Sequence, residues 1–540
     1  MKKNRALHPL LLALFPVLFL YSHNAREYPP GVMLVPLGLS LLLSLLCWLV
    51  FGLILRSVIK GALAASFFLL LFYSHGHLYN LLWYFFAVRP FTFGAEYILL
   101  PLWGILLSGS VMWFILTKRD LAQLNRWVNY VAIILLAISV FSVGLAIATV
   151  EHTALTEDDR GLSRPNVRTS SENPDIYYII LDGFARADIL AELYHLPRSR
   201  LVEFLAQRGF FVARRAGANY CQTDLSLASS LNFKYLDPAK DGYRPDSADR
   251  IPLKRMIAQN RVTTFLRDHG YTTVAFASGY EPTTLRNADI FLEPVGKAWF
   301  LDEFQSGLLQ TTPLPHIIPE MYRLPFIGGL SHPQADSRRR MLRRTMEMLG
   351  EMPARRSPKF VFAHLVTPHP PFLFGPHGEE IDPQGVFDLT DGNAFFGRYG
   401  QNRSDYITGY RNQLQYVETL VIDMVAAILE NSAHPPVIIL QADHGPGAYL
   451  DWNDSNRTNM RERLGILNAY YLPDGGDSLL YDTITPVNSF RVIFNCYFDA
   501  QLELLPDESY FSLWHKPYWF VPVGRAIKGD TSAPTGDHSN

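Results

Sequence analysis

The sequence predicts a multi-span α-helical membrane domain over residues 1–150 and an α/β soluble domain with a largely parallel central sheet over residues 175–540. Apolar stretches near membrane-spanning length are concentrated before residue 150. After residue 175, short apolar runs alternate with longer amphipathic stretches, which predicts strands and helices in turn. Between the two parts lies a polar segment, 151–174, with neither helical nor strand period, which we expect to be a linker.

The composition is that of a protein that keeps part of its surface in lipid. Charged residues make up only 18% of the 540, and aromatic residues 13%. The formal net charge of −2 leaves no basic surface for nucleic acid, so we expect no nucleic-acid partner. Cys47 lies in an apolar stretch, so only Cys221 and Cys496 could pair, and we expect these two to be buried free thiols.

Five apolar stretches are the candidate membrane spans: residues 6–21, 32–55, 61–73, 95–116 and 127–150. The second, fourth and fifth approach or exceed the roughly 20 residues that cross a bilayer, whereas the first and third are shorter. To cross, the third must continue into the aromatic stretch that follows it. That stretch, 75–86, is typical of an interfacial belt, and alternatively of a surface that presents a lipid head group.

Basic residues between the spans predict the orientation of the chain. They lie before the first span, between the second and third, and between the fourth and fifth: Lys2, Lys3 and Arg5; Arg56 and Lys60; Lys118, Arg119 and Arg126. With five spans all three clusters fall on one side, which the positive-inside rule assigns to the cytoplasm. Everything after residue 151 then lies outside the cytoplasmic membrane, and the loss of one short span would reverse this.

The soluble half contains five short, continuously apolar runs that predict buried strands: residues 176–181, 272–277, 360–363, 437–440 and 466–471. Amphipathic stretches between them predict helices, among them residues 186–194, 201–208, 338–350 and 406–429. Alternation of this kind is typical of a parallel sheet with helices on both faces. In such sheets ligands bind beyond the carboxyl ends of the strands, so the residues that follow each strand matter most.

Side chains with metal-binding chemistry follow three of the predicted strands. Asp182 follows the first strand, and His364 follows the third, with His369 further on. Asp443 and His444 follow the fourth. Alone, each residue could be a helix cap or a structural histidine, but together they favour a divalent metal of the Zn or Mn type over Mg or Ca.

The segment 219–232 carries the candidate nucleophile, Thr223. It has the pattern of a turn that runs into a helix rich in small residues. A threonine at the start of that helix has its oxygen near free backbone amides, which stabilise an anion. The alternative is that Thr223 only caps the helix.

In order along the chain, an Asp, a Thr, the motif His-x-x-x-x-His-Pro-Pro-Phe and an Asp-His-Gly triplet follow the predicted membrane region. This order resembles the alkaline phosphatase superfamily in its sulfatase-like branch. Within that branch the chain resembles membrane-bound lipoteichoic acid synthases, phosphoethanolamine transferases and uncharacterised bacterial membrane sulfatase-domain proteins. The resemblance covers essentially the whole chain and is firmest over residues 175–235, 359–373 and 436–473.

The resemblance implies roles for the residues at matching positions. Asp182, Thr223, Asp443 and His444 match a set that holds one divalent metal, and Thr223 also matches the nucleophile. Two histidines match positions near the transferred group, His369 first and His364 second. Arg186 is a candidate for holding the substrate anion, with a surface ion pair as the alternative.

The chain departs from true sulfatases at two positions. Cys221 is followed by neither the Pro or Ala nor the Arg of the Cys-x-Pro/Ala-x-Arg motif that is converted to formylglycine. Gly183 stands where true sulfatases typically carry a second metal-binding Asp. Cys221 should therefore remain a thiol, which favours Thr223 as the nucleophile and phosphoryl-group transfer over sulfate hydrolysis.

The resemblance implies a multi-pass enzyme of the bacterial inner membrane with its catalytic domain on the periplasmic or extracellular side. We expect it to move a phosphoglycerol- or phosphoethanolamine-type group from a membrane lipid to an envelope glycan or lipid, through a phosphothreonine intermediate. The alternative is a sulfatase-like hydrolase or phosphodiesterase acting on sulfate or phosphate esters. A non-enzymatic scaffold is disfavoured because every ligand position is filled, and a transporter because Glu96 is the only acidic residue in any span.

Overall fold

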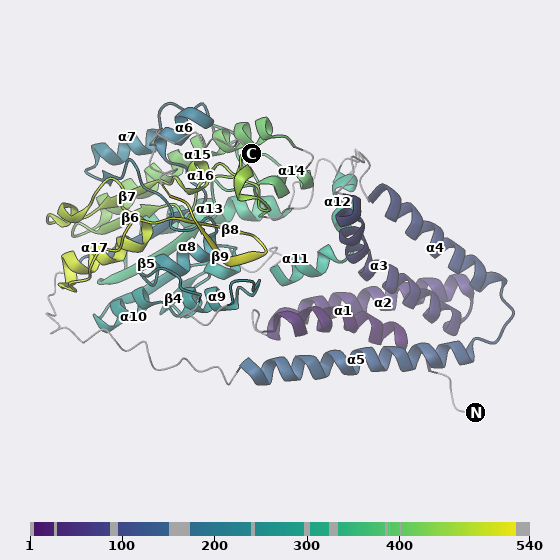
Figure 1. Ribbon diagram of the computed structural model, residues 1–540. Coiled ribbons are helices and arrows are strands. Elements are labelled where there is room, and N and C mark those ends of the chain that lie inside the picture. The colour runs from purple at the N-terminus through teal and green to yellow at the C-terminus, as the bar shows by residue number, and fades with distance from the viewer. Residues whose placement is uncertain are drawn as a thin grey trace, which may run out of the picture. The chain divides into compact units, whose positions relative to one another are not determined.

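The computed structural model describes residues 5–25, 30–86, 96–150, 173–238, 244–295, 303–322, 333–383, 387, 389–399 and 401–524. The chain forms two compact units (Figure 1). The first consists of Met1–Leu162 and Leu301–Leu330, and the second of Ser163–Phe300 and Ser331–Asn540. Most of the predicted linker, 151–172, lies outside the described residues.

Each of the five predicted apolar stretches forms a helix of the first unit: α1 (His8–Asn24), α2 (Leu34–Leu55), α3 (Val58–Phe86), α4 (Glu96–Leu116) and α5 (Ala122–Val150). Among the described residues, the last four of these regions are long and apolar enough to cross a membrane. The helix α1 has 17 residues and a length of about 26 Å, somewhat less than a bilayer core. The third stretch does continue through the aromatic residues, as crossing requires.

Polar contacts at one end of these helices show how they run. The His8 ring, at the start of α1, contacts Ser66 Oγ of α3 at 2.6 Å and Asn125 Oδ1 of α5 at 3.1 Å. Lys60 Nζ, near the start of α3, donates to the carbonyl oxygen of Thr117, just after α4, at 3.0 Å. The starts of α1, α3 and α5 therefore lie at the end where α4 finishes, so successive helices alternate in direction.

Two helices from the second half of the chain also belong to the first unit: α11 (Glu303–Gln310) and α12 (Leu314–Tyr322). The Phe304 ring packs against Tyr21 of α1, with ring centroids 6.1 Å apart. The backbone N–H of Gly76 in α3 donates to the Thr311 carbonyl at 2.9 Å. A Cβ at Gly76 would lie 1.9 Å from the Gln310 carbonyl oxygen, so only glycine permits this approach. In the sequence, residues 303–322 lie within the half predicted to be soluble. Nothing in their pattern predicts that they pack against the N-terminal helices.

A seven-stranded sheet forms the centre of the second unit, in the order β2 (Phe211–Val212), β7 (Asn468–Tyr471), β6 (Val437–Gln441), β1 (Ile176–Leu181), β5 (Lys359–Leu365), β3 (Thr272–Phe276), β4 (Ile290–Leu292). The five strands from β6 to β4 are parallel, and β7 and β2 pair antiparallel. The prediction of a largely parallel sheet is confirmed. β2 and β4 were not predicted, because two or three residues carry no detectable period.

Helices cover the sheet on both sides (Figure 1). One group packs together as α7 (Arg200–Gln207), α13 (Pro333–Glu351) and α15 (Arg403–Asn431), and another as α8 (Thr223–Ser230), α9 (Ile251–Ala258) and α17 (Pro486–Phe498). The remaining elements are α6 (Ala187–Leu193), α10 (Arg261–Asp268), α14 (Asn393–Tyr399), α16 (Met460–Leu464) and the hairpin β8 (Tyr510–Leu513) and β9 (Lys516–Pro522). All six residues of β1 are fully buried, which explains its continuous apolar sequence.

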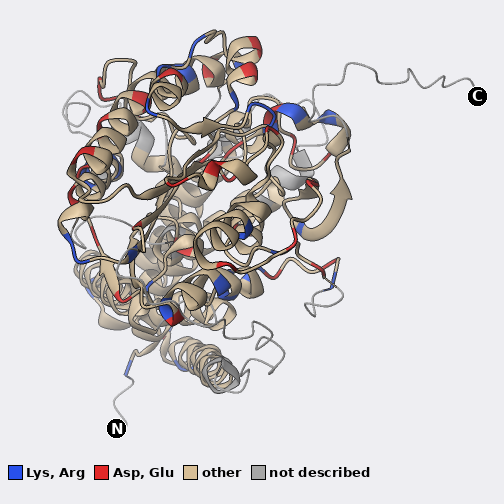
Figure 2. Ribbon diagram, turned by 90° about the vertical axis from the view of Figure 1, so that its left-hand side faces the viewer, with Lys and Arg blue, Asp and Glu red and all other residues tan. Residues whose placement is uncertain are grey.

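The two units differ sharply in charge. Lys, Arg, Asp and Glu are spread over the sheet-containing unit, whereas the N-terminal helices are almost entirely uncharged (Figure 2). Many large apolar side chains of α2, α4 and α5 are exposed, including Leu53, Ile105 and Phe141 at about 70%. Exposure on this scale is typical of helices that face lipid.

Candidate metal centre

Three neighbouring parallel strands deliver the predicted residues to one edge of the sheet. In the register of the sheet, Ile180 of β1 lies beside His364 of β5 and Gln441 of β6. Asp182 lies two residues beyond Ile180, and Asp443 lies two beyond Gln441. The carboxyl ends of β6, β1 and β5 therefore bring these side chains together, as the alternating pattern predicts.

Asp182, Asp443 and His444 form a buried cluster with the geometry of a metal site. One ligand atom from each lies within 4.8 Å of the other two. His444 Nε2 lies 3.6 Å from Asp182 Oδ1 and 3.3 Å from Asp443 Oδ2. Thr223 Oγ1 lies 3.1 Å from the same nitrogen, so all four predicted ligands meet at one point.

The cluster lacks a positive charge of its own. Asp182 Oδ1 and Asp443 Oδ2 are buried, and among the described residues neither has a hydrogen-bond partner. His444 Nδ1 donates to the Gly445 carbonyl at 2.9 Å, so Nε2 presents its lone pair to the two carboxylates. Desolvated acceptors that face one another are strongly unfavourable without a cation. A divalent metal fits this donor set, and carboxylate with imidazole favours Zn or Mn.

The electrostatics keep the ligands ready to bind a cation. Burial acts to raise the pKa of Asp182, but the imidazoles of His369, His364 and His444 outweigh it and hold the pKa well below its ordinary value. Burial lowers the pKa of His444, and the charge of Arg463 lowers it further. At neutral pH Asp182 is therefore ionised and His444 neutral, the forms that coordinate metals.

Two glycines shape the backbone beside the cluster. Gly183 has φ of +74°, which L side chains rarely adopt, and its N–H donates to Asp443 Oδ1 at 3.2 Å. A Cβ at Gly445 would lie 2.0 Å from the Glu462 carbonyl oxygen. Gly183 therefore orients one of the carboxylates, although it offers no side chain for a second metal.

Thr223 is the first residue of α8, and its hydroxyl does not cap the helix. The N-cap position belongs to Gln222, and no side chain caps this end. The Thr223 hydroxyl instead points to His444 Nε2. Ser226 Oγ, one turn later, lies within hydrogen-bonding distance of the Asp443 carbonyl at 2.8 Å. These contacts tie the start of α8 to the end of β6.

A second network holds the turn before α8. Arg250 Nη1 pairs with Asp224 Oδ2 at 2.5 Å, and Nη2 donates to Gln222 Oε1 at 2.6 Å. The Arg250 guanidinium also stacks on the Trp514 ring, 4.2 Å from its centroid. Residues on both sides of Thr223 are thus fixed by one arginine, which the sequence did not identify because it lies 27 positions later.

The two predicted histidines take different positions. His369 Nδ1 donates to the Pro370 carbonyl at 2.6 Å, and its ring centroid lies 6.2 Å from that of His444. His364 Nδ1 contacts Thr283 Oγ1 at 2.8 Å. His364 Nε2 lies 3.2 Å from Asp182 Oδ2, without the alignment of a hydrogen bond. His369 therefore lies close to His444 of the cluster, and His364 lies beside Asp182.

The structure adds Asp391 and Arg463, which sequence reasoning missed. Asp391 Oδ2 lies 3.9 Å from His369 Nε2 and 2.7 Å from Arg463 Nη1. Arg463 also donates to the Cys221 carbonyl at 2.9 Å and so joins the nucleophile turn to this pair. Burial raises the pKa of Asp391, but Arg463 and His369 outweigh it and lower that pKa. No motif surrounds either residue, so only the fold reveals them.

Arg186, the predicted anion-binding residue, is engaged with other partners. Its guanidinium pairs with Asp188 through Nε at 2.7 Å and Nη2 at 3.0 Å, and donates to the Ala216 carbonyl at 2.8 Å. Asp188 also pairs with Arg461 at 2.7 Å. An ion pair, the alternative named for this residue, is what the described contacts contain.

The three cysteines are free thiols. Cys221 is fully buried and accepts from the Ser512 backbone N–H at 3.3 Å. Burial raises its pKa, so the thiol stays protonated and unreactive at neutral pH.

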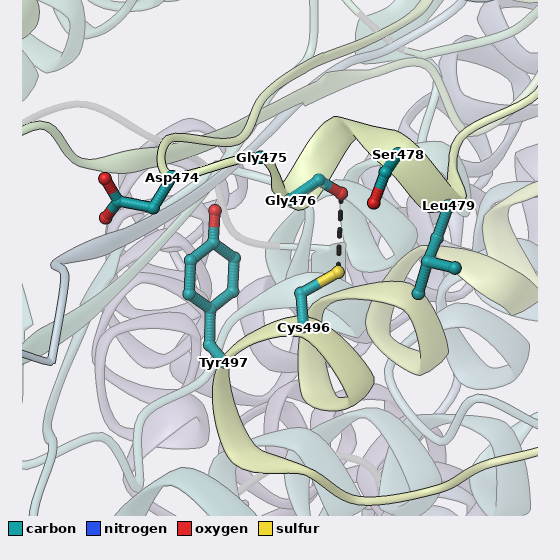
Figure 3. A pocket seen from close by; sticks show the side chains of 7 residues that line it. All are labelled: Asp474, Gly475, Gly476, Ser478, Leu479, Cys496 and Tyr497. Atoms are coloured by element: carbon teal, nitrogen blue, oxygen red, sulfur yellow. Dashed lines mark hydrogen bonds between the residues drawn. The ribbon is translucent and has the colours of Figure 1, made fainter.

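A surface cavity of about 350 Å³ lies away from these residues, between the loop after β7 and the end of α17 (Figure 3). It is lined by Asp474, Gly475, Gly476, Ser478, Leu479, Cys496 and Tyr497. Cys496 Sγ donates to the Gly476 carbonyl at 3.3 Å inside it. None of the predicted site residues lines this cavity, and its small polar rim has no cluster of catalytic groups.

The Sulfatase family model matches residues 174–489, more than half of the chain. The chain belongs to the sulfatase family. That family is part of the alkaline phosphatase superfamily, in agreement with the resemblance found in the sequence.

Solved structures that match the chain include two C-terminal periplasmic domains and a sulfatase. The C-terminal periplasmic domain of EcEptC from Escherichia coli, in complex with Zn, is 12% identical, with 62% of this chain and 85% of that chain covered and a TM-score of 0.40. The corresponding domain of phosphoethanolamine transferase EptC from Campylobacter jejuni is 10% identical, with 60% and 89% covered and a TM-score of 0.36. BT1596, a 2-O GAG sulfatase, is 16% identical, with 63% and 73% covered and a TM-score of 0.36. No curated protein matches the sequence significantly.

Proposed function

We propose that this protein is a membrane-anchored, metal-dependent phosphotransferase. It moves a phosphoglycerol- or phosphoethanolamine-type group from a lipid to an envelope glycan or lipid through a phosphothreonine intermediate. The observation that carries the proposal is the position of Thr223, whose hydroxyl lies 3.1 Å from His444 Nε2 in a cluster of two uncompensated carboxylates. A buried, unreactive Cys221 beside it supports threonine over a cysteine-derived nucleophile.

The residues of the cluster have separate tasks in this proposal. Asp182, Asp443, His444 and Thr223 would hold one divalent metal, Zn or Mn, which when bound would lower the pKa of the Thr223 hydroxyl and neutralise charge on the phosphoryl group. Thr223 Oγ1 releases its proton to solvent and attacks phosphorus; the new O–P bond forms as the bond to the leaving alcohol oxygen breaks. His369, whose Nδ1 is held by Pro370, directs Nε2 to the site and donates a proton or hydrogen bond to the departing oxygen.

The second step returns the enzyme to its starting state. The hydroxyl of an envelope glycan or lipid attacks the phosphothreonine phosphorus, and the Thr223–phosphorus bond breaks as the new ester bond forms. Thr223 regains a proton from solvent, and the acceptor hydroxyl gives its proton to His369. His369 now serves as the base for the acceptor, the reverse of its task in the first step.

The N-terminal unit supports a lipid as donor and a location outside the inner membrane. Its helices alternate in direction, and Arg5, Lys60 and Thr117 mark one end of the unit, the end that carries the basic clusters. Five crossings, with α1 as the first, leave the end of α5 on the opposite, periplasmic side.

A hydrolase is the alternative, and membership of the sulfatase family favours it as the second candidate. The same residues would then transfer the group to water, from phosphate or sulfate esters of the envelope. The two reactions share Thr223 and the metal and differ only in the acceptor, so product analysis separates them.

The test uses the full chain in detergent with zinc or manganese and phospholipids labelled in the head group. Mass spectrometry of the peptide that contains residues 219–232 is expected to find a phospho-head-group adduct on Thr223. The adduct should be absent from Thr223→Ala, whereas Ser229→Ala, whose hydroxyl donates to the Lys234 carbonyl, is the matched control in the same helix. An adduct that persists in Thr223→Ala would contradict the assigned nucleophile, and release of free head group without any acceptor product would favour the hydrolase.

A further inference from the structure

We propose that Arg338, on α13, is the substrate-anion-binding residue of this site and that it selects singly charged esters over doubly charged phosphate monoesters. The proposal deepens the function above and rests on it for the reaction, but not for the binding of the anion. Arg338 was assigned no role from the sequence, where it is the first of five arginines in a helix that otherwise looks like a charged surface element.

The other arginines of α13 have ordinary partners. Arg339 pairs with Asp336 and Asp382, Arg343 with Glu380, and Arg344 with Glu347 and Glu351. Arg340 is exposed to solvent. Arg338 is the exception, because it is only 2% exposed and no described carboxylate lies within salt-bridge distance of it.

Some N–H donors of the Arg338 guanidinium bind no described residue. Its only hydrogen bond with a described residue runs from Nη1 to the Ser278 carbonyl at 2.5 Å. The Nε and Nη2 groups are left without a partner in the described part of the chain. A guanidinium carries five N–H donors in a planar fork that matches the oxygens of a phosphate. Burying such a cation without a counter-charge is costly, which makes an anionic ligand the expected partner.

Contacts lead from Arg338 to the metal cluster. Ser278, whose carbonyl accepts from Arg338, follows β3, the strand beside β5. The Ser278 hydroxyl lies 2.9 Å from Thr283 Oγ1, and that oxygen lies 2.8 Å from His364 Nδ1. His364 Nε2 lies 3.2 Å from Asp182 Oδ2. Burial lowers the pKa of Arg338 to about 10 while Asp182 raises it, so the group is cationic at neutral pH.

The charges at this edge of the sheet indicate the class of substrate. A divalent metal balances Asp182 and Asp443, and Arg463 balances Asp391. Arg338 then leaves one positive charge uncompensated. One negative charge completes the balance, which fits a phosphodiester, a sulfate monoester or the head-group ester of Thr223. A phosphate monoester, with close to two charges at neutral pH, fits less well.

The experiment measures binding and does not need turnover. Zinc-loaded full-length Thr223→Ala protein is titrated with bis(4-nitrophenyl) phosphate, a monoanionic diester, and with 4-nitrophenyl phosphate, a monoester. Adding Arg338→Met is expected to weaken diester binding by about 10- to 100-fold, the effect of one hydrogen bond to a charged group. It should also abolish the preference for the diester. Arg340→Met, an exposed arginine on the same helix, is the control and should change binding less than about twofold.

Zinc content and thermal unfolding are measured on each variant. Diester binding by Arg338→Met within twofold of its parent, with zinc content unchanged, would overturn the proposal. Should Arg338→Met fail to fold or lose zinc, the test uses Arg338→Lys instead. An ammonium cannot reproduce the planar fork of the guanidinium, so diester binding should weaken severalfold. Unchanged binding in this variant would overturn the proposal. Because Thr223 is absent throughout, failure of the phosphothreonine adduct leaves this result intact.

Discussion

The buried carboxylates at the edge of the sheet fall into two groups, which differ in whether other side chains compensate their charge. Asp391 is held by Arg463 at 2.7 Å and accepts from the Tyr406 hydroxyl at 2.7 Å. Asp182 and Asp443 each keep one buried oxygen without a described partner. Both groups are nearly inaccessible to solvent, so their difference is in compensation and not in burial.

A third carboxylate, Glu462, is accommodated in another way. It is fully buried, accepts from the Tyr194 hydroxyl and the Tyr449 backbone N–H, and burial raises its pKa to about 8. Asp391 is thus ionised and paired, Glu462 is protonated at neutral pH, and Asp182 is ionised, while Asp182 and Asp443 each keep one oxygen without a described partner. The comparison teaches that an uncompensated carboxylate, more than a buried one, marks a candidate metal site.

The largest expected effect comes from removing one uncompensated carboxylate. Asp443→Asn should lower kcat/KM by at least about a thousandfold, because it removes both a ligand and half of the negative charge that holds the metal. Metal analysis should find substoichiometric zinc or manganese. Stoichiometric metal with full activity in this variant would show that the cluster is not the metal site.

The compensated carboxylate should matter for stability instead. Asp391→Asn leaves Arg463 buried without its counter-charge, so we expect the free energy of unfolding to fall by about 3–5 kcal/mol. In metal-free protein, Asp443→Asn should by contrast leave stability unchanged or raise it, because two facing carboxylates no longer repel. Chemical denaturation of both variants in the presence of a chelator measures their free energies of unfolding. Equal destabilisation by the two substitutions would contradict this difference between Asp391 and Asp443.

Removing the metal from the unmodified protein should lower its stability. A ligand present at a thousand times its Kd stabilises the folded state by about 4 kcal/mol, so chelation should reduce the unfolding temperature by several degrees. The shift should be absent from Asp443→Asn and present in Asp391→Asn. A shift of equal size in both variants would mean that the metal binds elsewhere.

A further prediction concerns pH. The pKa of Glu462 is raised in the folded state to about 8, above its unfolded value near 4.5, so the folded state binds the extra proton. This contribution to stability is complete below about pH 4.5 and is lost as pH rises toward 8. Glu462→Gln should therefore flatten the decline in unfolding temperature between pH 5 and 9, and an unchanged slope would assign that decline to other groups.

The sequence predicted the sheet and its site residues for reasons that are local. The strand over 176–181 was predicted with its observed bounds because a strand buried on both faces is apolar throughout. Asp182, Asp443 and His444 directly follow such strands, so the parallel topology was sufficient to bring them together. The antiparallel pairing of β7, and the brief β2 and β4, leave no such pattern and were found only in the structure.

From the sequence alone one can therefore predict the apolar N-terminal helices, the largely parallel sheet and the residues directly at the strand ends. Tertiary structure alone decided which charges are compensated. Arg463 lies 72 positions from Asp391, and Arg338 looks like its paired neighbours on α13 until their surroundings are known. It also decided that residues 303–322 pack with the N-terminal helices. The reason is physical: periodicity and composition report on burial along the chain, whereas charge compensation depends on contacts between distant segments.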